Sequence, residues 1–125
     1  MDENRIGEAV LGCGLRVHKA LGPGLLESAY EACLSYELNK AGLQHARQMA
    51  LPAVYDGIKI DLGYRLDLLV ADMVVVEVKA VDKLTDIHRA QLLSYLKLGD
   101  HRLGYLLNFN VKLFRDGICR MANHL

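Results

Sequence analysis

Residues 64–79 read YRLDLLVADMVVVEVK, and this stretch decides the fold. Two apolar runs within it, Leu68–Ala71 and Met73–Val76, are each as long as a buried strand. A turn near Ala71–Asp72 would let the two strands pair antiparallel. We therefore expect a hairpin that is buried along most of its length.

Charged side chains cluster at the open end of this hairpin. Asp67 lies on the first strand, and Glu77 and Lys79 lie on the second. Side chains along a strand alternate between faces, so Glu77 and Lys79, two residues apart, must share a face. Antiparallel pairing would bring Asp67 and Glu77 close together. The pattern predicts two carboxylates and one ammonium at one end of an apolar sheet.

Two interpretations of this cluster are consistent with its spacing. Glu77 could form an ion pair with Lys79, and Asp67 with Arg65, each contributing roughly 0–1 kcal/mol if exposed. Alternatively, Asp67 and Glu77 could be ligands of a hard divalent cation, with Lys79 completing a site that cleaves phosphodiesters. An isolated charge is costly in a medium of low dielectric, so each carboxylate must be paired, protonated or bound to a metal.

Composition excludes several classes of protein. The chain of 125 residues, 52% of them hydrophobic, is long enough for one domain with a true core. Its formal net charge is zero, which excludes a global basic field for nucleic acid, although residues 83–125 carry seven basic and three acidic side chains. Three widely spaced cysteines without a CxxC motif give no disulfide framework, zinc knot or iron–sulfur cluster.

Neither a signal peptide nor a membrane span is expected. The first ten residues, MDENRIGEAV, are acidic and polar, and no apolar run approaches the roughly 18 residues of a spanning helix. We therefore expect a cytoplasmic protein that does not act in a membrane.

Periodicity and turn residues place the remaining elements. Gly22-Pro23-Gly24 should end a first helix and open a second, and Thr85 should cap a third that is closed by Gly99. Asp56-Gly57 is typical of a hairpin turn. The expected helices cover residues 4–21, about 25–40 and 86–98, and the further strands cover 48–55, 58–60, 103–108 and 118–121.

Four polar residues on the second and third helices are candidates for a site. Glu27 lies in the first turn of its helix, where it could simply compensate the helix dipole, and Tyr30 is more typical of a core aromatic with a bonded hydroxyl. Gln91 and Tyr95 are four residues apart and share a helix face. Spacing alone also allows them to be an ordinary packing pair.

These residues together resemble a known family. Gly24-Leu-Leu-Glu27-Ser-Ala-Tyr30 fits the pattern of the small bacterial GxxExxY proteins, and the likeness continues through YRLDLLV, VVEVKAV, AQLLSYL, LNFN and DGI. That family resembles a compact branch of the PD-(D/E)xK nuclease superfamily. Gln91-Leu-Leu-Ser-Tyr95 is similar to the QxxxY motif of RecB-like nucleases. Leu66 stands where the superfamily pattern has proline.

The resemblance implies a fold. It is an α/β (α+β) domain with a restriction-endonuclease-like αβββαβ core, in which helices flank a central mixed sheet. Here an extra helix would precede the core, and residues 1–125 would form a single domain.

The resemblance also implies roles for site residues. Asp67, Glu77 and the carbonyl of Val78 would bind Mg²⁺ or Mn²⁺, and Glu27 would hold a water beside the ion or a second ion. Lys79 would position the attacking water. Gln91, with Tyr95 beside it, would hold the Lys79 end of the site or the substrate backbone.

Three functions remain open from the sequence. The first is a divalent-metal-dependent nuclease acting on DNA or RNA. The second is a catalytically silent module that binds nucleic acid or joins a complex. The third is hydrolysis of a small nucleotide or another phosphate ester, although Gly22-Pro23-Gly24 lacks the Lys-Ser/Thr of a phosphate-binding loop. Because so small a core carries no substrate-selecting domain, a homodimer or another partner is expected to complete the surface.

Overall fold

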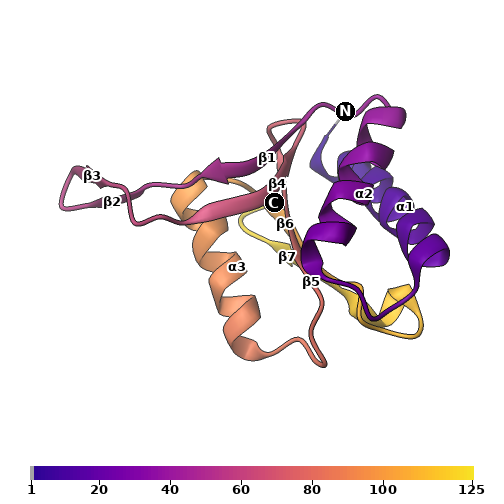
Figure 1. Ribbon diagram of the computed structural model, residues 1–125. Helices are drawn as coiled ribbons and strands as arrows, with labels where there is room; N and C mark the ends of the chain where they lie inside the picture. The colour runs from indigo at the N-terminus through magenta and orange to yellow at the C-terminus, as the bar shows by residue number, and fades with distance from the viewer. Residues whose placement is uncertain (1) are drawn as a thin grey trace.

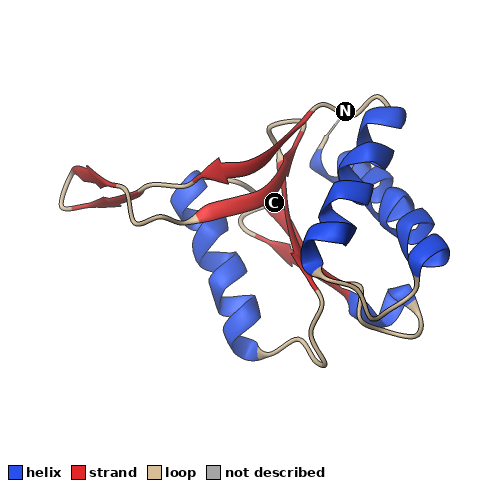
Figure 2. Ribbon diagram, in the orientation of Figure 1, coloured by secondary structure: helices blue, strands red, loops and turns tan. Residues whose placement is uncertain are grey.

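A five-stranded mixed sheet lies between two layers of helices (Figures 1 and 2). The computed structural model describes residues 2–125. The elements in chain order are α1 (Glu3–Leu21), α2 (Glu27–Lys40), β1 (His45–Ala50), β2 (Ala53–Tyr55), β3 (Ile58–Ile60), β4 (Arg65–Val70), β5 (Val74–Lys79), α3 (Asp86–Gly99), β6 (Leu103–Asn108), a 3₁₀ turn (Phe114–Gly117) and β7 (Ile118–Ala122). The sheet order is β1–β4–β5–β6–β7.

The topology confirms the predicted αβββαβ core. β1, β4 and β5 form an antiparallel meander after α2, and α3 then crosses over so that β6 pairs parallel with β5. α1 precedes the core, and β7 adds an antiparallel edge strand beside β6. The fold is therefore α+β, with helices on both faces of the sheet.

Burial on both faces explains the unbroken apolar runs of the central hairpin. Val74, Val76 and Val78 pack into the core formed with α1 and α2, whereas Val75 belongs to a second cluster with Leu92 of α3. A strand covered on both faces shows no polar alternation. The turn between the two strands lies where it was predicted, with Ala71 and Asp72 at φ values of 53° and 58°.

A close contact explains Gly14, one of the three glycines inside α1. A Cβ on Gly14 would lie 2.6 Å from Cζ of Phe114, so the helix approaches the 3₁₀ turn at this point. Gly12 faces open space, where only Arg16 comes within 4 Å. Close packing, rather than a loosened helix, therefore accounts for Gly14.

Tyr30 closes the connection between α1 and α2. Its hydroxyl donates to the carbonyl of Gly22 at 2.6 Å and accepts from the N–H of Leu25 at 3.1 Å. Its ring is fully buried and stacks on Phe109, with centroids 4.7 Å apart. The expected core role of Tyr30 is confirmed. The helix begins at Glu27, four residues after Pro23, so the proline lies in the connecting loop and does not open the helix.

The prediction of one strand over residues 48–55 is wrong. The chain bends at Leu51-Pro52. Leu51 is buried in the cluster that contains Val75 and Leu92, here called the α3-side cluster, and its N–H donates to the carbonyl of Tyr64. Beyond the bend, β2 and β3 form a separate two-stranded arm that projects from the body (Figure 1). The Asp56-Gly57 turn at its tip is as expected.

The caps of α3 are mostly as predicted. The Thr85 hydroxyl accepts from the N–H of His88, and the His88 ring accepts from the N–H of Thr85, which forms a capping box. The helix runs through Gly99, and Asp100 in the left-handed conformation is its C-cap. No helix within residues 2–125 combines the length and apolar character needed to cross a membrane.

Candidate functional site

The ladder between β4 and β5 stops before either strand ends. Backbone pairing runs from Val70 opposite Val74 to Leu68 opposite Val76. Both strands continue beyond that point, β4 toward Arg65 and β5 toward Lys79. Asp67 and Glu77 are the next residues on each strand, so the two carboxylates stand where the ladder opens.

Side chains take over the hydrogen bonds of the ladder at this opening. The N–H of Asp67 donates to Oε2 of Glu77 at 2.8 Å, and the N–H of Val78 donates to Oδ2 of Asp67 at 2.8 Å. Each carboxylate is therefore fixed by a backbone amide of the opposite strand. The predicted proximity of Asp67 and Glu77 is confirmed.

Burial makes this pair electrostatically unusual. Loss of solvent, followed by the nearby negative charge of Asp67, raises the pKa of Glu77 to about 8, against the opposing influence of the Asp67 N–H and of Lys79. Burial also raises the pKa of Asp67, although its hydrogen bond from Val78 opposes the shift. Glu77 is only 5% exposed. The positive charge of Lys79 is thus too little to bring the pKa values of the two carboxylates back to their ordinary range.

The ion-pair interpretation is not what the structure shows. Lys79 is partly buried, and its charge lowers the pKa of Asp67 and of Glu77. Yet none of the salt bridges formed within residues 2–125 includes Lys79 or Arg65. Lys79 therefore lowers the pKa values of Asp67 and Glu77 electrostatically, without forming a salt bridge in the described part of the chain.

The donor set fits a hard divalent cation. Within the described part of the chain, no group of three or more His, Cys, Asp or Glu side chains is arranged to hold a metal. Mg²⁺ commonly binds through one or two carboxylates and keeps several waters, so two carboxylates are enough. A cation would also offset the two causes that raise the pKa of Glu77, its loss of solvent and the negative charge of Asp67.

Glu31 is a site residue that sequence reasoning missed. It lies on α2, is 7% exposed, and accepts from Arg47 at 3.0 and 3.1 Å and from Gln48 at 2.7 Å. Its negative charge contributes to the raised pKa of both Asp67 and Glu77. A signal was available, because Glu27 and Glu31 are four apart and must share a helix face.

Glu27 lies at the edge of the same region. It is the first residue of α2, it is exposed, and its Oε2 accepts from the N–H of Ala80 at 3.2 Å. This contact places Glu27 beside the residue that follows Lys79. No hydrogen bond within residues 2–125 joins it to Asp67 or Glu77. Of Glu27 and Glu31, both on α2, Glu31 is the one whose negative charge helps to raise the pKa values of Asp67 and Glu77.

α3 brings Tyr95 to the site from the other face of the sheet. Tyr95 is 7% exposed, and its ring lies 5.7 Å from that of Tyr64, centroid to centroid. Burial and then the charge of Glu77 raise the pKa of Tyr95, which places the hydroxyl within the field of the carboxylates. Gln91, one turn earlier, is exposed. The structure therefore brings Tyr95 close and leaves Gln91 facing solvent.

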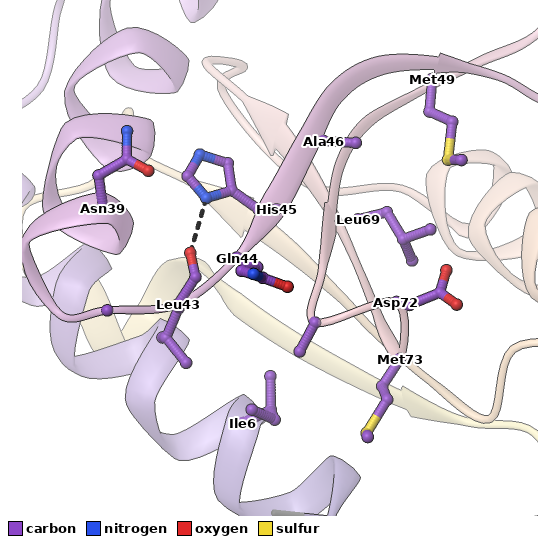
Figure 3. A pocket seen from close by; sticks show the side chains of 12 residues that line it. Ile6, Asn39, Leu43, Gln44, His45, Ala46, Met49, Leu69, Asp72 and Met73 are labelled. Atoms are coloured by element: carbon purple, nitrogen blue, oxygen red, sulfur yellow. Dashed lines mark hydrogen bonds between the residues drawn. The ribbon is translucent and has the colours of Figure 1, made fainter.

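A hollow on the surface lies apart from these carboxylates. A groove of about 880 Å³ is built from the loop between α2 and β1 and from the β4–β5 turn (Figure 3). His45, which hydrogen-bonds the Leu43 carbonyl, and Asp72 line it. Asp67, Glu77 and Lys79 do not line this groove.

The fold and the site together define a class of protein. An αβββαβ core, with helices on both faces of a mixed five-stranded sheet, is consistent with the restriction-endonuclease-like fold. A sequence model of the PD-(D/E)XK nuclease superfamily matches residues 4–121, and the chain belongs to this superfamily. Membership supports a nuclease-type function in general, and nucleases of this superfamily generally use divalent metals. Neither a curated protein nor a solved structure matches the chain.

Proposed function

We propose that this protein is a divalent-metal-dependent nuclease that hydrolyses phosphodiester bonds of DNA or RNA, acting as a single domain over residues 1–125. The observation that carries the proposal is the pair Asp67 and Glu77, oriented by backbone amides at the strand opening. A buried carboxylate, Glu77, beside a partly buried one, Asp67, both with raised pKa values, is a costly arrangement for stability alone. A bound metal ion would explain why the two carboxylates lie together despite this cost.

Asp67 and Glu77 would bind Mg²⁺ or Mn²⁺ together with the Val78 carbonyl. The ion supplies charge neutralisation on the phosphate and a more acidic water. Lys79 lies on the same strand two residues after Glu77 and has no ion-pair partner within residues 2–125. Its ammonium would orient the attacking water and balance negative charge that develops on phosphorus oxygens.

The flanking helices would complete the site. Glu27 would hold a water beside the ion or a second ion, and its contact with Ala80 keeps it near the Lys79 end of β5. Gln91 is exposed and would reach the substrate backbone or the Lys79 end of the site. Tyr95, whose hydroxyl lies in the field of Glu77, would stand beside it.

We also propose that the chain belongs to the GxxExxY branch of the superfamily. The first position of the pattern is Gly24, whose φ of 102° favours glycine. The last position is Tyr30, whose hydroxyl bonds Gly22 and Leu25 in the connecting loop. Glu27 begins α2 directly after that loop. The pattern would thus serve to set the start of α2 against the end of β5.

The test is incubation of purified protein with single- and double-stranded DNA and RNA in Mn²⁺. Cleavage that EDTA abolishes, and that Glu77→Ala and Lys79→Ala both lack, is the expected result. Cleavage that persists unchanged in both variants contradicts the proposed site. Salt-sensitive binding without cleavage by the wild type would instead indicate a silent nucleic-acid-binding module.

A further inference from the structure

Gln48 occupies an irregular position in β1. Its neighbours pair with β4, Arg47 opposite Leu68 and Met49 opposite Leu66, but the pair between them, Gln48 and Asp67, is missing from the ladder. Gln48 has a φ of 50°, in the left-handed region that residues with a Cβ rarely adopt. Such strain persists only where surrounding contacts enforce it.

The side chain of Gln48 contacts two carboxylates. Its Nε2 donates to Oε1 of Glu31 at 2.7 Å and to Oδ1 of Asp67 at 3.3 Å. An amide nitrogen carries two hydrogens, so one group can satisfy both carboxylates. Gln48 therefore links the α2 glutamate to a carboxylate of the strand opening.

The two oxygens of Asp67 are thereby held from opposite sides. Oδ2 accepts from the N–H of Val78 on β5, and Oδ1 accepts from Gln48 on β1. The guanidinium of Arg47 is engaged by the other oxygen of Glu31. The group that reaches Asp67 from β1 is thus a neutral amide, which orients the carboxylate without neutralising it.

We propose that Gln48 is a positioning residue that orients the Asp67 carboxylate for a divalent cation, and that Glu31 in turn fixes Gln48. This inference rests on the proposed function of the same site. Partners that orient ligand side chains typically change metal affinity by about 10–100-fold when they are removed. The alternative is that Gln48 only fastens β1 to α2 and has no effect on the metal.

Two variants separate the effect of the Gln48 side-chain hydrogen bonds from the effect of its strained backbone. Gln48→Ala removes the amide and keeps the strained φ, whereas Gln48→Gly removes the amide and relaxes the strain, because glycine adopts this conformation readily. Gln44→Ala is the matched control, since Gln44 is an exposed glutamine that lies just before β1 and lines the groove of Figure 3. Melting temperature is measured beside Mn²⁺ affinity for each protein.

Calorimetric titration with Mn²⁺ alone provides the decisive readout. We expect both Gln48 variants to bind Mn²⁺ about 10-fold or more weakly than the wild type and Gln44→Ala, with Gln48→Gly melting no lower than Gln48→Ala. Cleavage by Gln48→Gly should recover as Mn²⁺ is raised, which a purely structural defect would not do. Wild-type affinity in Gln48→Gly overturns the positioning role alone. Failure of the wild type to bind Mn²⁺ overturns this role and the proposed metal site together.

Discussion

Asp67 and Glu77 each stabilise the strand that carries the other. Glu77 accepts the backbone N–H of Asp67, and Asp67 accepts the N–H of Val78, the residue after Glu77, both at 2.8 Å. These two bonds hold the strands in the opened arrangement beyond Leu68 and Val76. The geometry of the carboxylate pair is therefore part of the fold, and its charge state should influence stability.

Stability without metal should fall as pH rises. The folded pKa of Glu77, about 8, lies above its ordinary value of 4.5, so the folded protein keeps a proton that the unfolded chain releases between these values. The resulting stabilisation is complete below about pH 4.5 and is lost through pH 8, at about 1.4 kcal/mol per pKa unit. Melting in EDTA should therefore occur at a lower temperature at pH 8.5 than at pH 5.

Glu77→Gln should reduce this pH dependence. The amide cannot ionise, so the variant should melt above the wild type at pH 8.5 in EDTA, by roughly 5 °C or more. Glu8→Gln, an exposed change on α1, is the control and should follow the wild type. A variant that melts below the wild type at pH 8.5 would show that the Glu77 charge is already compensated.

Added Mn²⁺ should stabilise the wild type at pH 8.5. Binding to the folded state alone raises stability by about 2.7 kcal/mol at 100 times the dissociation constant. Glu77→Gln should lose most of this increase, because it lacks one of the two proposed ligands. Scanning calorimetry measures both proteins, and an equal increase in the two would place the ion elsewhere.

Lys79→Ala should separate binding from chemistry. The lysine forms no salt bridge within residues 2–125, so the variant should fold and bind Mn²⁺. Loss of a group that balances developing charge should lower the cleavage rate by on the order of 10²–10³-fold. Single-turnover cleavage at saturating Mn²⁺ measures the rate. A rate near that of the wild type would remove Lys79 from the mechanism.

Paired glycine substitutions in α1 test the packing. Gly14→Ala should destabilise the fold by about 1–3 kcal/mol, because its Cβ would meet the Phe114 ring. Gly12→Ala should be neutral or stabilise by up to about 1 kcal/mol, since its site is open and alanine favours helix. Urea denaturation compares the two, and equal effects would contradict the close approach of α1 to the 3₁₀ turn.

The central hairpin was predictable because its determinants are local. Strand alternation and the turn at Ala71–Asp72 were enough to bring Asp67 opposite Glu77. The bend at Leu51-Pro52 was not, since it depends on Leu51 reaching the α3-side cluster. The alternation of residues along a predicted strand does not indicate which side chains α3 will cover in the folded protein.

Glu31 and Gln48 were not predicted for a related reason. Their meeting requires α2 to lie across β1, and it requires Gln48 to adopt a backbone conformation that no strand propensity favours. Glu27, in contrast, stood out through a sequence pattern. The positions of Lys79, Gln91 and Tyr95 on their elements followed from spacing, whereas their roles at the site remain predictions.

Anomalous diffraction from crystals soaked in Mn²⁺ tests the central claim most directly. We predict a peak at the opening of the β4–β5 ladder, about 2.0–2.3 Å from an oxygen of Asp67 and from an oxygen of Glu77. Absence of a peak at that position under saturating Mn²⁺, with the two carboxylates still bonded to the backbone amides, would contradict a metal-dependent site.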